Sequence, residues 1–137
     1  NFGSMGYSLP AAIGAAIADT DRRVISYVGD GSLMMALQEI ETAVRYDLPI
    51  VVVVLNDSSY GIIRHRQERD VGRTTGTDYE NTNFAGVSRE MGAKAARIQS
   101  VDDLSVLEEH FASTASTPLV LDAVTDPEVA RPGFPKY

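Results

Sequence analysis

The chain has 137 residues, 44% of them hydrophobic, which is long enough for one globular domain with a buried core. Its 12 basic and 19 acidic side chains give a net charge of −7, which argues against a nucleic-acid or anionic-membrane surface, so any bound phosphate must be held locally. The absence of cysteine excludes disulfides, thiol catalysis and thiolate metal ligands, and two histidines are too few for a zinc cluster.

The start of the chain favours a cytoplasmic protein whose sequence begins inside a longer one. No apolar run approaches the roughly 20 residues of a membrane helix. Residues 1–6 contain no initial Met and lack the basic and apolar regions of a signal peptide. We therefore expect the first elements of the domain to precede residue 1.

The first part of the chain predicts an alternation of helices and strands. We expect a glycine-rich loop at residues 3–8, a helix at 10–18 and a strand at 23–28. A second helix at 32–46 and a second strand at 50–55 should follow. Ser32 is expected to cap its helix. The first strand shows little polar alternation, which is typical of a strand covered by helices on both faces.

The second part continues the same alternation. We expect a short amphipathic segment at residues 62–69, an irregular stretch at 70–82 and a helix at 84–91. A strand at 94–98, a helix at 101–113 and a strand at 119–124 should follow. Asn83 is expected to cap the first of these helices, and Ser100 with Asp103 resembles a capping box. The stretch 70–82, rich in Gly, Thr and Asp, is the best candidate for a mobile flap.

This order of elements predicts an α/β fold with three α-β-α layers around a mainly parallel, doubly wound sheet. We expect one domain over residues 1–125 and a C-terminal extension over residues 126–137, which contain three prolines.

Polar residues follow the first two predicted strands, where a parallel sheet places them at one edge. The first set is Gly29-Asp30-Gly31-Ser32, and the second begins with Asn56-Asp57. An Asp carboxylate suits Mg²⁺, the glycines let the backbone approach an anion, and Ser32 with the following helix presents N–H groups to it. Each set alone also fits an ordinary turn. Together they favour a joint cation and phosphate site.

The two motifs, together with the Gly-x-Met-Gly-x-x-Leu-Pro-Ala-Ala-Ile-Gly pattern from Gly3 to Gly14, resemble the diphosphate-binding domain of thiamine-diphosphate enzymes. The chain is most similar to the C-terminal domain in the acetohydroxyacid synthase, benzoylformate decarboxylase and benzaldehyde lyase group. The resemblance covers nearly the whole chain.

The resemblance implies a Mg²⁺ ion bound by Asp30, by a side chain after the second strand and by a backbone carbonyl two residues beyond it. Asp57 and the Ser59 carbonyl occupy the last two places, where the family usually has Asn for the side chain, and Asn56 remains the alternative to Asp57. An Asp in that place adds a negative charge beside the diphosphate.

The resemblance also implies which residues surround thiamine diphosphate. The Gly3 carbonyl would accept from the aminopyrimidine, and Met5 would be the bulky side chain that bends the cofactor. Those implied to lie near the diphosphate are Gly29, Gly31, Ser32 and, in some members, Tyr60.

By the same resemblance, the enzyme cleaves or forms the carbon-carbon bond beside the carbonyl of a small 2-oxo acid or aldehyde, as a lyase or transferase. The activating glutamate of the family belongs to a pyrimidine-binding domain of the same or a partner subunit, and no residue here matches it. We therefore assign no catalytic side chain, and we expect the chain alone to be inactive and the full enzyme to be a homodimer or homotetramer.

Two other classes remain as alternatives. A haloacid-dehalogenase-like Mg²⁺-dependent phosphatase also has Gly-Asp-Gly after a strand, but its nucleophilic Asp-x-Asp should end a strand, and here Asp19 and Asp21 follow a helix. A nucleotide-binding module should carry Gly-x-Gly-x-x-Gly after the first strand, which is absent.

The remaining candidate residues for a substrate pocket give weaker indications of function. Ile62, Ile63, His65 and Arg66 fit either a substrate pocket or an exposed helix, the latter being favoured for His65 and Arg66. His110 is expected to be structural or solvent-facing.

Overall fold

A computed structural model describes residues 3–113 and 116–129 of the chain. Its four strands form one sheet in the order β1-β2-β4-β3, and each neighbouring pair is parallel. The strands are β1 (Val24–Gly29), β2 (Ile50–Asn56), β3 (Lys94–Ile98) and β4 (Leu119–Val124). All four agree with the predicted strands to within one residue.

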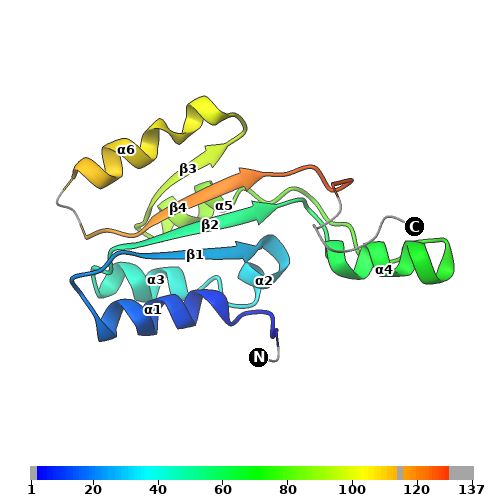
Figure 1. Cartoon of the computed structure of the whole chain (residues 1–137), viewed down its shortest axis with the longest axis horizontal. Coiled ribbons are helices and arrows are strands. Elements are labelled where there is room, and N and C mark those ends of the chain that lie inside the picture. Colours follow the sequence, from blue (N-terminus) through cyan, green and yellow to red (C-terminus); the bar gives the residue numbers. More distant parts are fainter. Residues whose placement is uncertain (1–2, 114–115, 130–137) are drawn as a thin grey trace.

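Helices cover the sheet on both sides (Figure 1). They are α1 (Ser8–Ala18), α2 (Asp30–Met34), α3 (Glu39–Arg45), α4 (Gly61–Val71), α5 (Phe84–Glu90), the 3₁₀ turn η1 (Val101–Leu104) and α6 (Ser105–Ala112). In Figure 1, α1 and α3 lie below the sheet and α6 lies above it. The three-layer α/β fold with a parallel sheet is thus confirmed.

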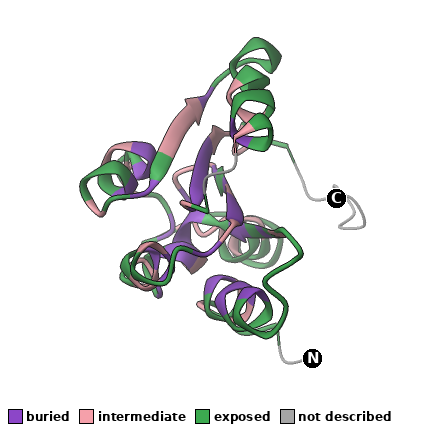
Figure 2. Ribbon diagram, turned by 90° about the vertical axis from the view of Figure 1, so that its left-hand side faces the viewer, coloured by how far each residue is buried: buried purple, intermediate pink, exposed green. Residues whose placement is uncertain are grey.

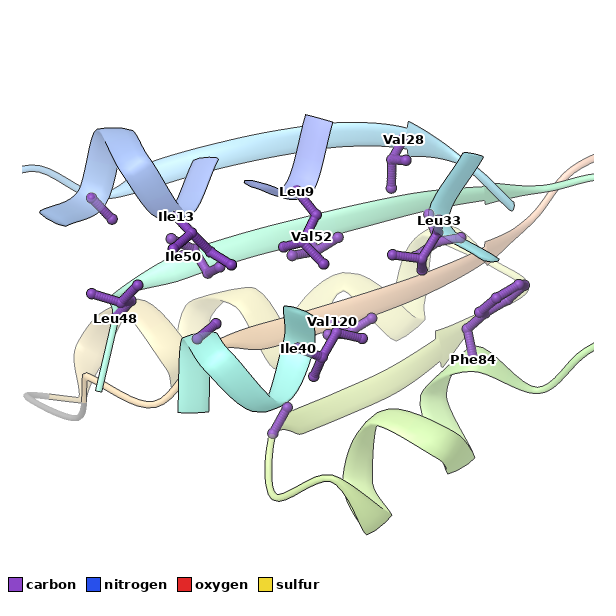
Figure 3. Packing of buried hydrophobic residues seen from close by; sticks show 14 residues of the cluster. Leu9, Ile13, Val28, Leu33, Ile40, Leu48, Ile50, Val52, Phe84 and Val120 are labelled. Atoms are coloured by element: carbon purple, nitrogen blue, oxygen red, sulfur yellow. The ribbon is translucent and has the colours of Figure 1, made fainter. Parts of the chain in front are cut away.

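The larger core lies between the sheet and helices α1, α3 and α5. Leu9 and Ile13 of α1 lie beside Val52 and Ile50 of β2, Ile40 of α3 lies beside Val120 of β4, and Phe84 of α5 closes one end (Figure 3). A smaller core under α6 joins Val51, Ile98, Leu119 and Leu121. Figure 2 shows the buried residues along the strands and the inner helix faces, with the outer faces exposed.

The expectation that both faces of the first strand are covered is wrong. Ile25 is 51% exposed and Tyr27 is 67% exposed, and Leu55 of the adjacent β2 is 46% exposed. These residues alternate onto the face that carries α6, but that helix packs over β3, β4 and the neighbouring part of β2. The outer part of this sheet face is therefore open in the described chain.

The single helix expected from Ser32 is also wrong. Helix α2 begins two residues earlier, with Gly29 in an extended conformation as its N-cap, and ends at Met34. Ala36, Glu39 and Ile40 donate to carbonyls three residues earlier, so the chain passes through a 3₁₀ turn into the start of α3. Ser32 is not a cap, because its Oγ instead accepts a bond from the Gly6 amide at 2.9 Å.

Both helix starts predicted in the second part of the chain are confirmed. Asn83 Oδ1 accepts from the Gly86 amide at 2.8 Å, as an N-cap does. Ser100 and Asp103 form the reciprocal capping box, although it opens a 3₁₀ turn that leads into α6 rather than one continuous α-helix.

The stretch 70–82 differs from the expected flap. Its first two residues belong to α4, and its later part is bonded to the turn that follows β2, since Tyr60 N donates to Thr77 O and Tyr79 N donates to Ser58 O. Most of the expected C-terminal extension, residues 130–137, lies outside the described residues. No helix among the described residues has the length and apolar character of a membrane span.

His110 of α6 is buried, which agrees with the structural rather than the solvent-facing interpretation of this residue. It is only 4% exposed, and none of the residues that the structure describes bonds its Nδ1. Burial, with Lys94 and Arg23 nearby, lowers its pKa below the ordinary value. The fold therefore favours the neutral form of this side chain.

Candidate functional site

The parallel register brings the two predicted motifs to one edge of the sheet. Gly29 at the end of β1 lies opposite Leu55 near the end of β2. Asp30, the first residue of α2, is only 3% exposed, and its Oδ2 accepts from the Ser58 amide at 2.8 Å. Its Oδ1 accepts from the Gly31 amide at 2.7 Å. The carboxylate thus faces the turn that follows β2, as the spacing of the motifs predicted.

The surroundings of Asp30 include a second carboxylate, that of Asp57. Burial raises the pKa of Asp30, while the nearby Tyr79 hydroxyl and hydrogen bonds from the Gly31 and Ser58 amides lower it, and the Asp57 carboxylate raises it. A buried carboxylate beside a second carboxylate is stabilised when a cation lies between them.

Residues 57–59 form a tight turn, called here the 57–59 corner. Asp57 Oδ1 accepts from both the amide and the hydroxyl of Ser59, at 3.0 and 3.2 Å. Ser58 has a φ of 58°, in the left-handed region. A Cβ at position 61 would lie 2.8 Å from Asp57 Oδ2, so the glycine there keeps this oxygen accessible. The corner presents its Ser58 amide to Asp30, and the Asp57 carboxylate lies close enough to raise the pKa of Asp30.

Asn56, the alternative ligand, has its amide group engaged elsewhere. It is fully buried, and its Nδ2 donates to Asp122 Oδ1 at 2.8 Å and to Thr82 O at 3.0 Å. Its Oδ1, the atom that a metal would bind, accepts from Ser58 Oγ at 3.5 Å.

Two tyrosines lie beside the glycine of the first motif. A Cβ at Gly31 would lie 2.7 Å from the Tyr60 ring, so the ring can approach the backbone this closely only because position 31 is a glycine. Tyr60 and Tyr79 meet edge to face at 5.3 Å, and the Tyr79 hydroxyl donates to Ser59 O at 3.4 Å. Burial raises the pKa of Tyr79 far above its ordinary value. Tyr79 contacts both sides of the site, yet the sequence analysis did not select it.

The N-terminal glycine-rich loop reaches the same edge. The bond from Gly6 N to Ser32 Oγ ties this loop to α2, and both Gly3 and Gly6 have positive φ values, 61° and 79°. Met5 between them is 41% exposed. The structure therefore places Met5, next to Gly6, close to Ser32, and Gly3 lies in the same loop.

The oxygen atoms at this edge suit a hard divalent cation. Asp30 and Asp57 supply carboxylates, and Ser59 supplies a backbone carbonyl. Within residues 3–113 and 116–129, no three or more His, Cys, Asp or Glu side chains are grouped so that they could hold a metal ion. Mg²⁺ typically takes one or two protein carboxylates and completes its octahedron with phosphate oxygens and water. The donor set thus fits Mg²⁺ bound together with a phosphorylated ligand.

The polar side chains of α4 do not join this site. Every α4 residue is described, and none is buried. Arg66 pairs with Asp70 on its own helix, and His65 Nδ1 lies 3.5 Å from Glu68. The helix projects past the end of the sheet (Figure 1). The exposed-helix interpretation of His65 and Arg66 fits this placement.

Comparison with known proteins gives concordant matches. The family model of the thiamine pyrophosphate enzyme C-terminal TPP-binding domain matches residues 1–123. The acetolactate synthase of Bacillus subtilis is 35% identical over 124 residues, which are 90% of this chain and 21% of that protein.

Two solved structures share the fold. One is the thiamine diphosphate-dependent 4-hydroxybenzoylformate decarboxylase of Rhodococcus jostii, with a TM-score of 0.81 and 28% identity over 89% of this chain and 23% of that one. The other is the benzoylformate decarboxylase of Polynucleobacter necessarius, with a TM-score of 0.83 and 25% identity over 94% of this chain and 25% of that one. This chain spans no more than about a quarter of each of these proteins. By its family match over nearly its whole length, the chain belongs to the thiamine pyrophosphate enzymes, as their C-terminal TPP-binding domain.

Proposed function

We propose that the edge formed by β1, β2 and the 57–59 corner binds Mg²⁺ and, through it, the diphosphate of thiamine diphosphate. The ligands would be the carboxylates of Asp30 and Asp57 and the carbonyl of Ser59. The observation that carries this proposal is the buried Asp30 carboxylate, which lies 2.8 Å from the Ser58 amide in the middle of the corner. A cation shared by both segments would neutralise the two carboxylates.

The remaining residues would shape the cofactor pocket. Gly29, beside which a Cβ would meet no atom within 4 Å, would let the diphosphate approach the backbone, and Gly31 would leave room for the Tyr60 ring. The Ser32 hydroxyl, which already accepts from the Gly6 amide, would fix the loop that carries Gly3 and Met5. Tyr60, over Gly31, would line the diphosphate. When bound, thiamine diphosphate supplies the electron sink for breaking or forming a bond beside a carbonyl. The chain's own part is to bind the charge and orient the cofactor.

The full enzyme would be a decarboxylase or carboligase of 2-oxo acids or aldehydes, classed as a lyase or transferase. Support comes from the similar proteins named above, an acetolactate synthase and two benzoylformate-type decarboxylases. Residues 1–125 would be the cofactor-binding domain and residues 126–137 an extension. We further propose a cytoplasmic homodimer or homotetramer whose pyrimidine-binding domain supplies the activating glutamate, so that this chain alone lacks turnover.

The phosphatase alternative is not favoured. Its nucleophilic Asp-x-Asp would have to lie beside the metal, but Asp19 and Asp21 lie between the end of α1 and the start of β1. Asp30 lies at the other end of β1.

Calorimetric titration of the full-length enzyme tests the proposal. We expect thiamine diphosphate to bind in the presence of Mg²⁺ and to bind at least about 10-fold more weakly when the metal is removed by EDTA, because the diphosphate would then face two uncompensated carboxylates. ATP and NAD serve as controls and should give no comparable heat. Tighter binding of ATP or NAD than of thiamine diphosphate, or binding indifferent to Mg²⁺, would contradict the proposal.

A further inference from the structure

We propose that Asp122, Arg97 and Asn81, called here the Asp122 network, act as positioning residues that hold the 57–59 corner in the shape a cation needs. The inference rests on the proposed function, because it concerns the same Mg²⁺ site. None of the three was selected from the sequence, and none would touch the metal or the cofactor.

The network starts from a carboxylate in the middle of the sheet. Asp122 of β4 is fully buried, between β2 and β3. Its Oδ1 accepts from Asn56 Nδ2, and its Oδ2 accepts from the Phe84 amide and from Arg97 Nη1, each at 3.1 Å. An ionised group in such a place is costly unless it is paired and bonded, whereas an apolar residue would fill the space without that cost. Asp122 of β4 thus joins β2, β3 and α5 through hydrogen bonds, which an apolar residue at this position could not do.

Arg97 carries the connection outward from Asp122. While Nη1 binds Asp122, Nη2 of the same guanidinium donates to Asn81 Oδ1. The rigid planar fork of arginine can hold two partners in fixed relative positions, which a lysine ammonium on a flexible stem does not do. Asn81 is thereby fixed by a group that is itself anchored in the sheet.

Asn81 connects Arg97 to the 57–59 corner. Its Nδ2 donates to Ser58 Oγ at 2.9 Å. Ser58 lies between the two proposed ligand residues, Asp57 and Ser59, and its amide is the donor to Asp30. Ser58 has a φ of 58°, in the left-handed region where residues other than glycine are strained. The corner therefore needs contacts from outside to keep this conformation.

A loss of this support would tilt the carbonyl of Ser59 and the carboxylate of Asp57. Mg²⁺ tolerates little departure from octahedral geometry. Partners one layer behind metal ligands typically alter metal affinity by about 10- to 100-fold.

The test compares two asparagines of the same loop. In the full-length enzyme with saturating thiamine diphosphate and no substrate, calorimetric Mg²⁺ titration of Asn81→Ala should show about 10-fold weaker binding. Asn83→Ala is the matched control, because it also removes a side-chain hydrogen bond, the one that Asn83 accepts from Gly86 N, and within the described residues the Asn83 side chain bonds no residue of the corner. It should change Mg²⁺ affinity less than about 2-fold although it removes a helix cap.

A double-mutant cycle tests the connection itself. Arg97→Lys keeps a positive charge beside Asp122 but loses the second arm to Asn81, so it should weaken Mg²⁺ binding about as much as Asn81→Ala. The double variant should then be no worse than either single variant. Fully additive losses, or equal Mg²⁺ affinities of Asn81→Ala and Asn83→Ala, would overturn the network. If the unaltered enzyme itself bound no Mg²⁺ with thiamine diphosphate, the proposed function would fail instead.

Discussion

Replacing Asp30 with asparagine is expected to weaken Mg²⁺ binding in the presence of thiamine diphosphate by about 100-fold or more, beyond the range seen for residues behind the ligands. Asp30 is buried at the meeting point of both motifs, so its carboxylate is the strongest fixed counter-charge available to a cation there. The side-chain amide that replaces the carboxylate is neutral. Its NH₂ group would face one of the two backbone amides from which the carboxylate now accepts a hydrogen bond, so a donor would meet a donor. Calorimetric Mg²⁺ titration of the full-length variant measures the loss.

Asp57→Asn is the matched control for this prediction. It makes the same chemical change beside the same site, but at the position where the family usually has Asn, so an amide oxygen there should still serve as a ligand. We expect Mg²⁺ affinity to change by no more than about 3-fold, because the lost attraction is offset by weaker repulsion of the diphosphate. Equal losses in Asp30→Asn and Asp57→Asn would remove the distinction that the geometry makes between the two carboxylates.

Asp122→Ala is expected to lower the free energy of unfolding by about 3 to 4 kcal/mol. The carboxylate accepts from three groups, and its loss leaves the buried Phe84 amide and the Arg97 guanidinium without that acceptor. Urea denaturation of the chain, followed by circular dichroism, gives the difference.

Asp103→Ala controls for the loss of an aspartate that accepts several bonds. Asp103 accepts from Gln99 N, Ser100 N and Ser100 Oγ, but in an exposed capping box. Because water can replace the lost partners there, its loss should destabilise the chain clearly less than Asp122→Ala. If the two substitutions cost the same, the burial of Asp122 would contribute nothing and the account of its role would be wrong.

The sequence predicted the elements whose signals are local. The apolar runs of β2 and β4 and the cap at Asn83 each depend on adjacent residues, and all three are present. The meeting of Asp30 with the turn after β2 was also predictable, because parallel strands carry their carboxyl ends to one edge.

What the sequence could not show depends on contacts between distant residues. Asn56 and Asp122 are separated by 66 positions, and Ser58 and Asn81 by 23, so no local pattern links them. Tyr79 lies in a stretch whose Gly, Thr and Asp content indicated only a loop, and its ring reaches Tyr60 through the folded path of the chain. The break between α2 and α3 was missed for a different reason. The helical spacing of apolar residues continues across a 3₁₀ turn, so periodicity alone does not reveal it.

A crystal structure of the full-length enzyme with thiamine diphosphate and Mn²⁺ in place of Mg²⁺ tests the central claim most directly, because manganese can be located by its anomalous scattering. We expect one ion within about 2.3 Å of Asp30, Asp57 and the Ser59 carbonyl and in contact with diphosphate oxygens. A manganese peak elsewhere, or a diphosphate bound at this edge with no ion between Asp30 and the 57–59 corner, would contradict the account.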